Sequence, residues 1–510
     1  MKPIAIVGAG IGGLVAGARL ARSGAAVIVL EAHVYPGGCA GTFYHQGYRF
    51  DAGATLAGGF APGGPMEQVA DAVGLDAWDT QPAEPAMVVH LPDGQQVARW
   101  GDPARWREER LRFDPAGEGF WAWQERTAEI LWDAAQQLPP WPPQSAGQAV
   151  ALARLGMHIL SAEHASIPDL ALDAVLPVRR RLAKAAGRTR LLIDGQLLIS
   201  AQTTSGRANA LYAAAALDLP RRGVVHLAGG MGTLAVRLAE HLTRLGGTIH
   251  FRQRVTSVRP LPGGAGYRLE TAKGLTLDAS QVIFNLPPAN IDHLLRAEPD
   301  ASSPAPGEAQ PSDAWGAFCL YLGLEESTLP PDVPLHHQVL RGEPLGEGNS
   351  AFLSLSPYWD ATRAPAGHRA LTISTHTSPA PWWDLHQRDR AAFEARVEDY
   401  TERLLHAADV ALPGIRSRIR LQLPATPLTF QRFTLRAGGW VGGFPQTHLL
   451  RFAPARLGRG LHRVGDSIFP GQSTAAVALG GLRVAQLVQC EAGRSSWAAR
   501  QDAAPQAEIA

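Results

Sequence analysis

The first 31 residues constrain the fold more than any other part of the sequence. Residues 3–7 form a short apolar run typical of a strand buried on both faces, and residues 8–13 (GAGIGG) satisfy the pattern G-x-G-x-x-G. A helical pattern follows over 14–23, and a second apolar strand over 25–30 leads to Glu31. Strand, glycine turn, helix, strand and acid in this order predict a βαβ unit that binds a dinucleotide.

Each glycine of the turn has a mechanical role in such a unit. We expect Gly8 to permit the tight turn, Gly10 to let the backbone approach a pyrophosphate, and Gly13 to let the helix pack against the strand. The amide groups at the start of the helix attract the phosphates. Glu31 is placed to accept hydrogen bonds from ribose hydroxyls, and its charge favours NAD or FAD over NADP.

Two segments after this unit add to the predicted site. Gly37 and Gly38 give the backbone a second close approach to the cofactor. Residues 48–55 have the pattern of a strand that leads into a glycine-rich turn. Asp51 in this strand is a candidate polar group near the cofactor, although an acid at a strand end is more often structural.

The C-terminal part of the chain supplies a second half of the site. Residues 461–464 have the pattern of a strand, and residues 472–474 are typical of a cap before a helix over 475–488. The start of that helix would stabilise negative charge on a flavin. The alternative is a surface turn before a C-terminal helix. The residues predicted to contact the cofactor here are Gly465, Asp466, Gln472 and Thr474.

Composition excludes several other classes of protein. The 47 basic and 46 acidic residues leave a net charge of +1, which argues against a nucleic-acid partner bound through bulk charge. Three widely spaced cysteines build neither a disulfide framework nor a CxxC pair, and this is typical of a reducing compartment. The histidines form no HExxH or HxH pattern, so we expect no metal site. No G-x-S-x-G motif of a hydrolase is present.

Five segments together resemble the carotenoid desaturase and carotene isomerase group of flavoproteins, and within it the carotenoid 3,4-desaturases most. They are GAGIGGL at 8–14, LEAHVYPGGCAGTF at 30–43, YRFDAGAT at 48–55, GGWVGGFPQ at 438–446 and VGDSIFPGQSTAAVALGG at 464–481. The resemblance covers both ends of the chain closely and the middle loosely. It implies non-covalent FAD on a split Rossmann-type domain and a polyene substrate taken from a membrane.

The chain departs from its wider relatives at one position of the cofactor site. Many amine-oxidase relatives have Arg directly after the glycine pair, whereas this chain has Cys39, which puts one phosphate contact in doubt. A second glycine motif at 230–235 (GMGTLA) permits two interpretations. It is either a second nucleotide site suited to NADP or, as the resemblance implies, the start of a helix within the FAD domain. The resemblance also implies that the backbone of Val255 pairs with the adenine.

The fold class that we predict is α/β, with a split Rossmann-type FAD-binding domain and an inserted α+β substrate-binding domain. The FAD-binding domain is expected to comprise residues 1–65, 216–290 and 426–492. The substrate-binding domain is expected to comprise 66–215 and 291–425, and residues 493–510 are expected to form a disordered tail.

The sequence also suggests how the protein could meet a membrane. A Pro-rich spacer at 139–143 leads to an apolar helix over 149–160, and a basic run at 179–190 is followed by the apolar residues 191–193. Basic and apolar residues side by side suit a helix on an anionic membrane surface, and the alternative is a solvated helix face that packs on a core. No uninterrupted apolar stretch is long enough to span a bilayer. We therefore expect a cytoplasmic protein with a peripheral membrane contact.

The function that we predict is FAD-dependent desaturation of an acyclic or hydroxylated carotenoid, at the 3,4 position. Hydride loss from carbon beside a polyene leaves a delocalised cation, so a weak base suffices for the second hydrogen and no catalytic residue is assigned. The electron acceptor would be a quinone or oxygen. The alternatives are a carotene cis–trans isomerase that uses reduced FAD, a non-catalytic prenyl-lipid-binding protein, and an amine oxidase.

Overall fold

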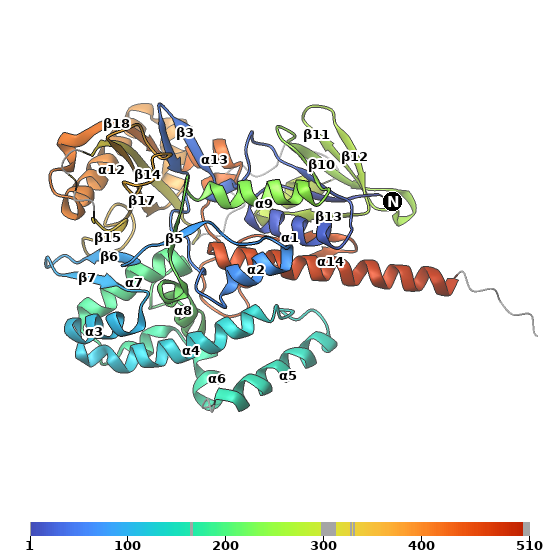
Figure 1. The fold of residues 1–510 in the computed structure, drawn as a ribbon, viewed down its shortest axis with the longest axis horizontal. Coiled ribbons are helices and arrows are strands. Elements are labelled where there is room, and N and C mark those ends of the chain that lie inside the picture. The colour runs from blue at the N-terminus through green and yellow to red at the C-terminus, as the bar shows by residue number, and fades with distance from the viewer. Residues whose placement is uncertain (1, 164–166, 297–312, 327–328, 330–331, 503–510) are drawn as a thin grey trace, which may run out of the picture.

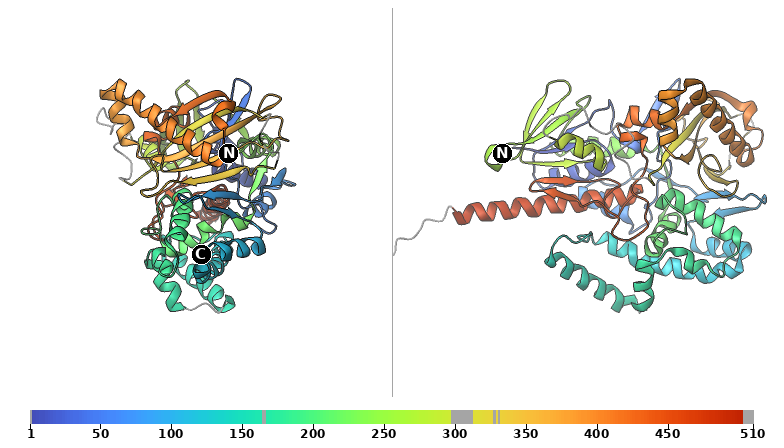
Figure 2. Two further views of the ribbon diagram at one scale, coloured as in Figure 1. Left: turned by 90° about the vertical axis from the view of Figure 1, so that its left-hand side faces the viewer. Right: turned by 180° about the vertical axis from the view of Figure 1, so that it is seen from behind.

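The computed structural model describes residues 2–163, 167–296, 313–326, 329 and 332–502. Its elements fall into a nucleotide-binding part around α1, α9 and α14, a sheet-based part around β14, β17 and α12, and a helical layer that contains α3, α4 and α8 (Figure 1). Seen from behind, the long C-terminal helix α14 leaves the body of the molecule on the side of the N-terminus (Figure 2). This mixed architecture confirms the predicted fold class.

The nucleotide-binding part is built on a six-stranded sheet in the order β19-β20-β13-β1-β2-β9. The central strand β1 pairs in parallel with β2 and β13, and β9 and β20 extend the parallel sheet on either side. Strands drawn from both ends of the chain therefore meet in one sheet. The strands are β1 (Ile4–Val7), β2 (Val27–Leu30), β9 (Thr248–His250), β13 (Gln281–Phe284), β19 (Arg456–Gly458) and β20 (Leu461–Arg463).

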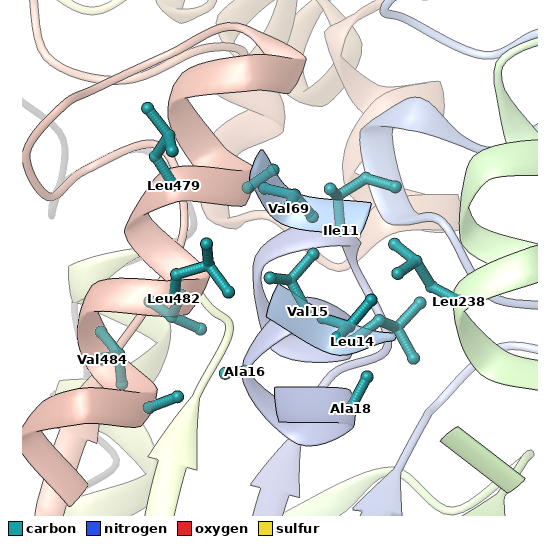
Figure 3. Close-up of a cluster of buried hydrophobic side chains, with 14 of the residues drawn as sticks. Ile11, Leu14, Val15, Ala16, Ala18, Val69, Leu238, Leu479, Leu482 and Val484 are labelled. Atoms are coloured by element: carbon teal, nitrogen blue, oxygen red, sulfur yellow. The ribbon is translucent and has the colours of Figure 1, made fainter. Parts of the chain in front are cut away.

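Three helices pack around this sheet through apolar side chains. They are α1 (Ile11–Arg22), α9 (Gly232–Arg244) and α14 (Thr474–Asp502). Figure 3 shows Val15 of α1 facing Leu482 of α14, with Leu238 of α9 on the other side of α1, and all three side chains are buried. The approach of α1 to α14 is close enough that a Cβ added at Gly481 would lie 2.7 Å from the backbone oxygen of Gly12.

Smaller elements complete this part of the molecule. A three-stranded antiparallel sheet stands beside the main sheet, and the hairpin β3–β4 covers the start of α9. The remaining pair, β5 with β8, joins a strand from each predicted domain. These elements are β3 (Thr42–His45), β4 (Tyr48–Asp51), α2 (Pro65–Val73), β5 (Thr80–Pro82), β8 (Val225–Leu227), β10 (Val255–Pro260), β11 (Tyr267–Thr271), β12 (Thr276–Ala279) and α10 (Pro288–Leu295).

A seven-stranded sheet forms the second part, in the order β18-β14-β17-β16-β15-β6-β7. Helix α12 buries Tyr400 and Leu404 among the sheet residues Phe318 and Ile373. The strands are β6 (Met87–His90), β7 (Gln96–Arg99), β14 (Gly316–Glu325), β15 (His336–Leu340), β16 (Ser350–Leu355), β17 (His368–Thr377) and β18 (Ile419–Ala425). The helices are α11 (Ala380–Arg388), α12 (Arg390–Ala411) and α13 (Pro427–Thr434).

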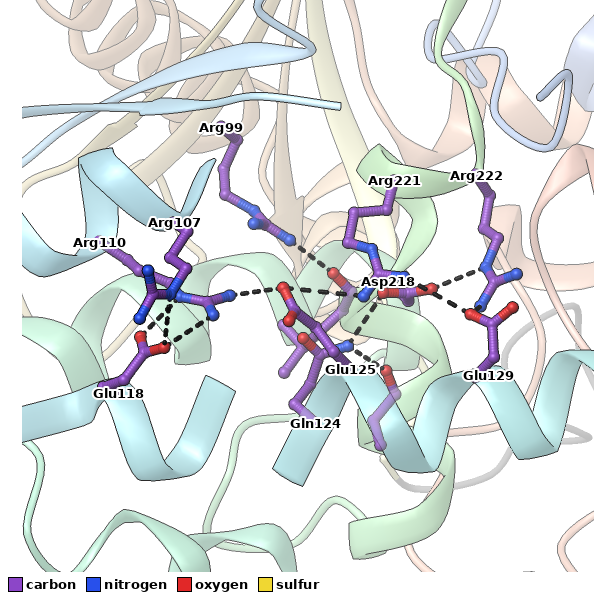
Figure 4. A network of polar contacts seen from close by, with 12 residues as sticks. Arg99, Arg107, Arg110, Glu118, Gln124, Glu125, Glu129, Asp218, Arg221 and Arg222 are labelled. Atoms are coloured by element: carbon purple, nitrogen blue, oxygen red, sulfur yellow. Dashed lines mark hydrogen bonds and ion pairs between the residues drawn. The ribbon is translucent and has the colours of Figure 1, made fainter. Parts of the chain in front are cut away.

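An ion-pair network holds the helical layer together. Arg110 of α3 binds Glu118 at 2.8 Å and also contacts Glu125 of α4 (Figure 4). Arg222 joins the buried Asp218 to Glu129 at 2.7 Å each. The helices of this layer are α3 (Pro103–Phe113), α4 (Glu118–Gln136), α5 (Ala146–Glu163), α6 (Ile167–Val175), α7 (Gly187–Ala201) and α8 (Ala210–Leu217).

The basic segment 179–190 is not one continuous helix, because a short 3-10 turn over Val178–Leu182 precedes α7. Arg180 and Arg181 turn toward the buried carboxylate of Asp173, at 3.3 and 2.7 Å. Leu192 and Ile193 of α7 are fully buried in the core of the helical layer, as the alternative interpretation requires. The side chains of Arg179, Lys184 and Arg188 are exposed, so a membrane contact of this segment stays a prediction. Within the described residues, no helix is both long and apolar enough to cross a bilayer.

The C-terminus also differs from expectation over part of its length. Helix α14 continues to Asp502, so residues 493–502 are helical rather than part of a disordered tail. Ala, Arg and Gln favour a helix, and no proline interrupts the segment before Pro505. Residues 503–510 lie outside the described part of the chain.

The second glycine motif packs the helix α9 against the hairpin β3–β4. A Cβ added at Gly232 would lie 2.6 Å from the backbone nitrogen of Thr42, and one at Gly230 would lie 2.4 Å from a carboxylate oxygen of Asp51. Asp51 accepts hydrogen bonds from the amide of Met231 at 2.9 Å and from Arg363 at 3.1 Å. Asp51 is therefore a structural acid that fixes the start of α9, and the motif serves packing.

This geometry predicts the effect of removing the Asp51 carboxylate. Asp51→Ala leaves the buried Arg363 guanidinium without its acid and should lower the free energy of unfolding by about 3 kcal/mol, as measured by urea denaturation. Asp278→Ala, which breaks a solvent-exposed pair with Arg268, should leave that free energy nearly unchanged. Equal effects of the two substitutions would contradict the structural role of Asp51.

Candidate cofactor and substrate site

One cavity of about 1720 Å³ is lined by residues of both large sheets. Ten of the eleven predicted cofactor residues line it, and the exception, Gly13, lies beneath the glycine turn. The structure therefore brings together residues that are more than 450 positions apart in the sequence. The ten are Gly8, Gly10, Glu31, Gly37, Gly38, Val255, Gly465, Asp466, Gln472 and Thr474.

The glycine turn between β1 and α1 leaves no space for side chains. Gly8 has a φ of +97°, and a Cβ added at Gly10 would lie 2.4 Å from the amide nitrogen of the Asn285 side chain. A Cβ at Gly13 would lie 2.8 Å from the backbone oxygen of Gly8. The turn thus keeps bare backbone at the cavity wall while α1 rests directly on β1.

The pair Gly37-Gly38 lies against this turn. The amide of Gly37 donates to the backbone oxygen of Ala9 at 2.9 Å, and Gly37 and Gly10 form an isolated parallel bridge. Gly37 has a φ of +125°, and a Cβ there would lie 2.7 Å from Gly41 Cα, so a side chain would not fit. Both glycine segments therefore present backbone to the same part of the cavity.

Glu31 stands at the end of β2 and fixes the backbone around it. Its carboxylate accepts hydrogen bonds from the amide of Ala9 at 2.6 Å and from the amide of His33 at 2.7 Å. Because Glu31 also lines the cavity, its carboxylate is placed where ribose hydroxyls could donate to it. Val255 begins β10 on the neighbouring wall, where the predicted adenine contact would be made.

The C-terminal half of the site is organised by two side chains. The carboxylate of Asp466 accepts a hydrogen bond at 2.9 Å from Arg436, a residue that sequence reasoning missed. The Gln472 side chain accepts from the amide of Gly443 at 3.1 Å and donates to the backbone oxygen of Ile199 at 3.0 Å. Gln472 therefore joins the start of α14 to α7.

The residues present fit the shape and charge of FAD. The N-cap of α1 is Gly10, which provides no side-chain cap, and the first turns of α1 and α14 contain no acid. Two helix N-termini therefore direct partial positive charge toward one cavity, as phosphate and reduced flavin require. Glu31 supplies the acceptor for ribose, and the glycine turns supply the close approach of the backbone.

Helix α12 contributes Arg390, Glu394 and Glu398 to the cavity lining, whereas the wall formed by α7 and the seven-stranded sheet is uncharged. Its apolar lining comes from Leu198, Ile199, Ala317, Cys319 and Phe352, and its polar lining includes Gln338, Ser374 and His376. Burial lowers the pKa of His376 to about 4, so its imidazole is neutral at physiological pH. Sequence reasoning missed these residues because they come from separate strands and α7, and no local motif marks them.

A glycine-lined cradle at the end of a Rossmann-type sheet, continuous with an uncharged wall from α7 and the second sheet, is that of an FAD-dependent oxidoreductase. The chain belongs to the flavin containing amine oxidoreductase family, whose model matches residues 11–488.

Individual relatives show which members of this family the chain is similar to. The chain is 28% identical over 526 residues to prolycopene isomerase 2, chloroplastic, of an Oncidium hybrid cultivar, which covers 98% of this chain and 86% of the relative. It is 25% identical to the carotenoid 3,4-desaturase of Haloarcula japonica, over 80% of this chain and 81% of the relative. These relatives confirm the resemblance to the carotenoid desaturase and isomerase group.

Solved structures support the fold. An oxidoreductase from Methanosarcina mazei superimposes with a TM-score of 0.60 at 16% identity, over 95% of this chain and 100% of that chain. At this identity the similarity concerns the fold alone.

The hydrogen bonds of Glu31 predict the outcome of its removal. Glu31→Ala should weaken FAD binding by about 1–3 kcal/mol, because two backbone amides lose their acceptor and the ribose loses a partner. Titration of apoprotein with FAD, followed by flavin fluorescence, measures the change. Glu67→Ala removes a carboxylate that accepts a backbone amide outside the cavity and is the matched control. Unchanged FAD affinity in Glu31→Ala would contradict the assignment.

Proposed function

We propose that the protein is an FAD-dependent carotenoid desaturase that introduces a carbon–carbon double bond into an acyclic or hydroxylated carotenoid. The observation that carries this proposal is the continuity of the FAD cradle with a chamber that has no acidic or basic side chain on its described α7 and sheet walls. A polyene is uncharged and fits such a chamber. A cationic amine held against these walls would leave its charge without a partner, since the acids Glu394 and Glu398 of the cavity lining lie on α12.

Different residues would have different roles in this reaction. Bound FAD supplies a two-electron acceptor. The glycine turns and Glu31 would hold the cofactor, and Leu198, Ile199 and Phe352 would position the polyene and exclude water. The Nε2 of the neutral His376 imidazole lies 3.4 Å from the side-chain nitrogen of Gln202. The other ring nitrogen would bind a polar end of the substrate. The intact cradle argues against a non-catalytic prenyl-lipid carrier.

The position of the new double bond is a finer part of the proposal. We propose the 3,4 position, because the segment at 464–481 resembles that of 3,4-desaturases and the related isomerases, and one 3,4-desaturase matches over 80% of this chain. A quinone or oxygen would take the electrons from the cofactor.

Isomerisation is the second candidate. Prolycopene isomerases match a larger share of this chain, 98%, at a slightly higher identity than the 3,4-desaturase does. An isomerase of this kind would use reduced FAD without net oxidation, and the same cavity would serve it.

An anaerobic product assay separates the two candidates. Holoenzyme is incubated with acyclic and 1-hydroxy carotenoids in liposomes, once with oxidised FAD and a benzoquinone and once with reduced FAD. Desaturation should give a product that lacks two hydrogens, only with oxidised FAD and the quinone. A product of unchanged mass that forms only with reduced FAD would replace the desaturase by the isomerase. No change in any pigment would contradict both.

We further propose that the protein takes its substrate from a membrane through α6. Leu172 and Val175 lie three residues apart at the end of this helix, and Leu176 follows directly after it. Their exposed fractions are 43%, 73% and 36%. Helices α5 and α6 form the lower edge of the molecule in Figure 1, away from the seven-stranded sheet. Apolar side chains at a protruding edge are suited to the interface of a bilayer.

Substitution of this face provides the test. Leu172→Glu/Val175→Glu should strongly reduce flotation with phosphatidylglycerol–phosphatidylcholine vesicles, because the apolar contact is lost, while the FAD content remains unchanged. Val410→Glu on α12, at a valine that is 43% exposed, is the matched control and should float like the wild type. Equal flotation of all three proteins, or flotation of none, would reject α6 as the docking surface.

A further inference from the structure

We propose that Arg436 is the positioning residue on which FAD binding depends, because it neutralises Asp466 and ties three segments of the cradle together. The inference concerns the cofactor site and holds for either candidate reaction.

The local structure sends Arg436 into the protein. Helix α13 begins with a capping box between Thr426 and Thr429 and ends at Leu435, which has a φ of +57°. This left-handed residue stops the helix and turns the chain, so that the next side chain points inward. Arg436 is 12% exposed at its side chain and lines the cavity.

The guanidinium group joins three segments of the cradle. Its Nε donates to the backbone oxygen of Trp440 at 2.8 Å, and its Nη2 donates to the backbone oxygen of Gly442 at 2.8 Å. Its Nη1 donates to Asp466 at 2.9 Å. The thiol of Cys39 lies beside the guanidinium, close enough for the two groups to interact electrostatically. The turn at 37–39, the loop at 440–443 and the turn at 465–466 therefore share one partner.

The negative charge of Asp466 explains why a phosphate ligand would need Arg436 beside it. A Cβ added at Gly12 would lie 3.4 Å from the amide nitrogen of Gly465, so the turn that carries Asp466 lies at the start of α1. A carboxylate at this place would repel the two negative charges of the FAD pyrophosphate. Arg436 offsets that charge, and the carboxylate can still accept a hydrogen bond from a hydroxyl group.

The neighbouring thiol does not compete for this charge. Burial raises the pKa of Cys39, against the opposing effect of Arg436, so the thiol stays neutral. Burial alone would lower the pKa of the Arg436 guanidinium, but the carboxylate of Asp466 raises it on balance. Arg436 is thus the cation beside position 39, although it lies 397 positions further along the chain.

Binding measurements on apoprotein test the proposal without turnover of a carotenoid. Arg436→Met should weaken both FAD and ADP about 10- to 100-fold, where ADP is the probe that carries a pyrophosphate without a flavin. Arg436→Lys keeps the charge but loses the fork geometry, and should recover part of the ADP affinity. Arg416→Met removes an exposed arginine that does not line the cavity and is the control, with affinities equal to the wild type.

A double-mutant cycle with Asp466→Asn shows whether Arg436 acts through the acid. If it does, Arg436→Met costs less affinity for ADP in the Asp466→Asn protein than in the wild type. Additive effects, or ADP affinity within twofold of the wild type in Arg436→Met, would overturn the proposal. If Arg436→Met does not fold, as judged by its thermal midpoint, the same cycle is run with Arg436→Lys, where additivity again overturns it.

Discussion

Direct backbone contact around α1 is the constraint on which the rest of the structure depends. A Cβ at Gly13 would lie 2.8 Å from the oxygen of Gly8 in the turn after β1, and a Cβ at Gly481 of α14 would lie 2.7 Å from the oxygen of Gly12. Helix α1 therefore touches the turn after the central strand on one side and α14 on the other with no side chain between them. A single methyl group at either contact would displace the walls of the cofactor cavity.

The sequence predicted this region well because the relevant signals are local. Apolar runs, glycine turns and the acid at position 31 stand in a fixed order, and short-range sterics dictate what each residue does. Strand β1 and helix α1 were expected within a few residues of their observed bounds, and the six strands of the first sheet come from the segments that the sequence assigned to one domain. Ten of the eleven predicted cofactor residues line one cavity.

The parts that sequence reasoning missed depend on pairing between distant elements. The floor of the second chamber comes from β14, β16 and β17, which are not in chain order in the sheet. Arg436 has no motif around it, and its role arises from contacts with three loops. The basic segment at 179–190 was ambiguous for a related reason, since only the folded chain shows that Asp173 lies within reach of Arg180 and Arg181.

The contact between α1 and α14 also determines when the nucleotide-binding part can complete its folding during synthesis. The first helix of the chain has its apolar face covered by a helix that begins at Thr474 of 510 residues. At translation rates of about 5–20 residues per second, the N-terminal unit waits roughly 25–100 s for that partner to leave the ribosome. Throughout this interval the glycine turn has one wall and the side chains of Ile11 and Val15 lack their cover. The complete cradle can therefore take up its cofactor only after α14 has left the ribosome, and until then the nascent chain carries an exposed apolar helix that chaperones can recognise.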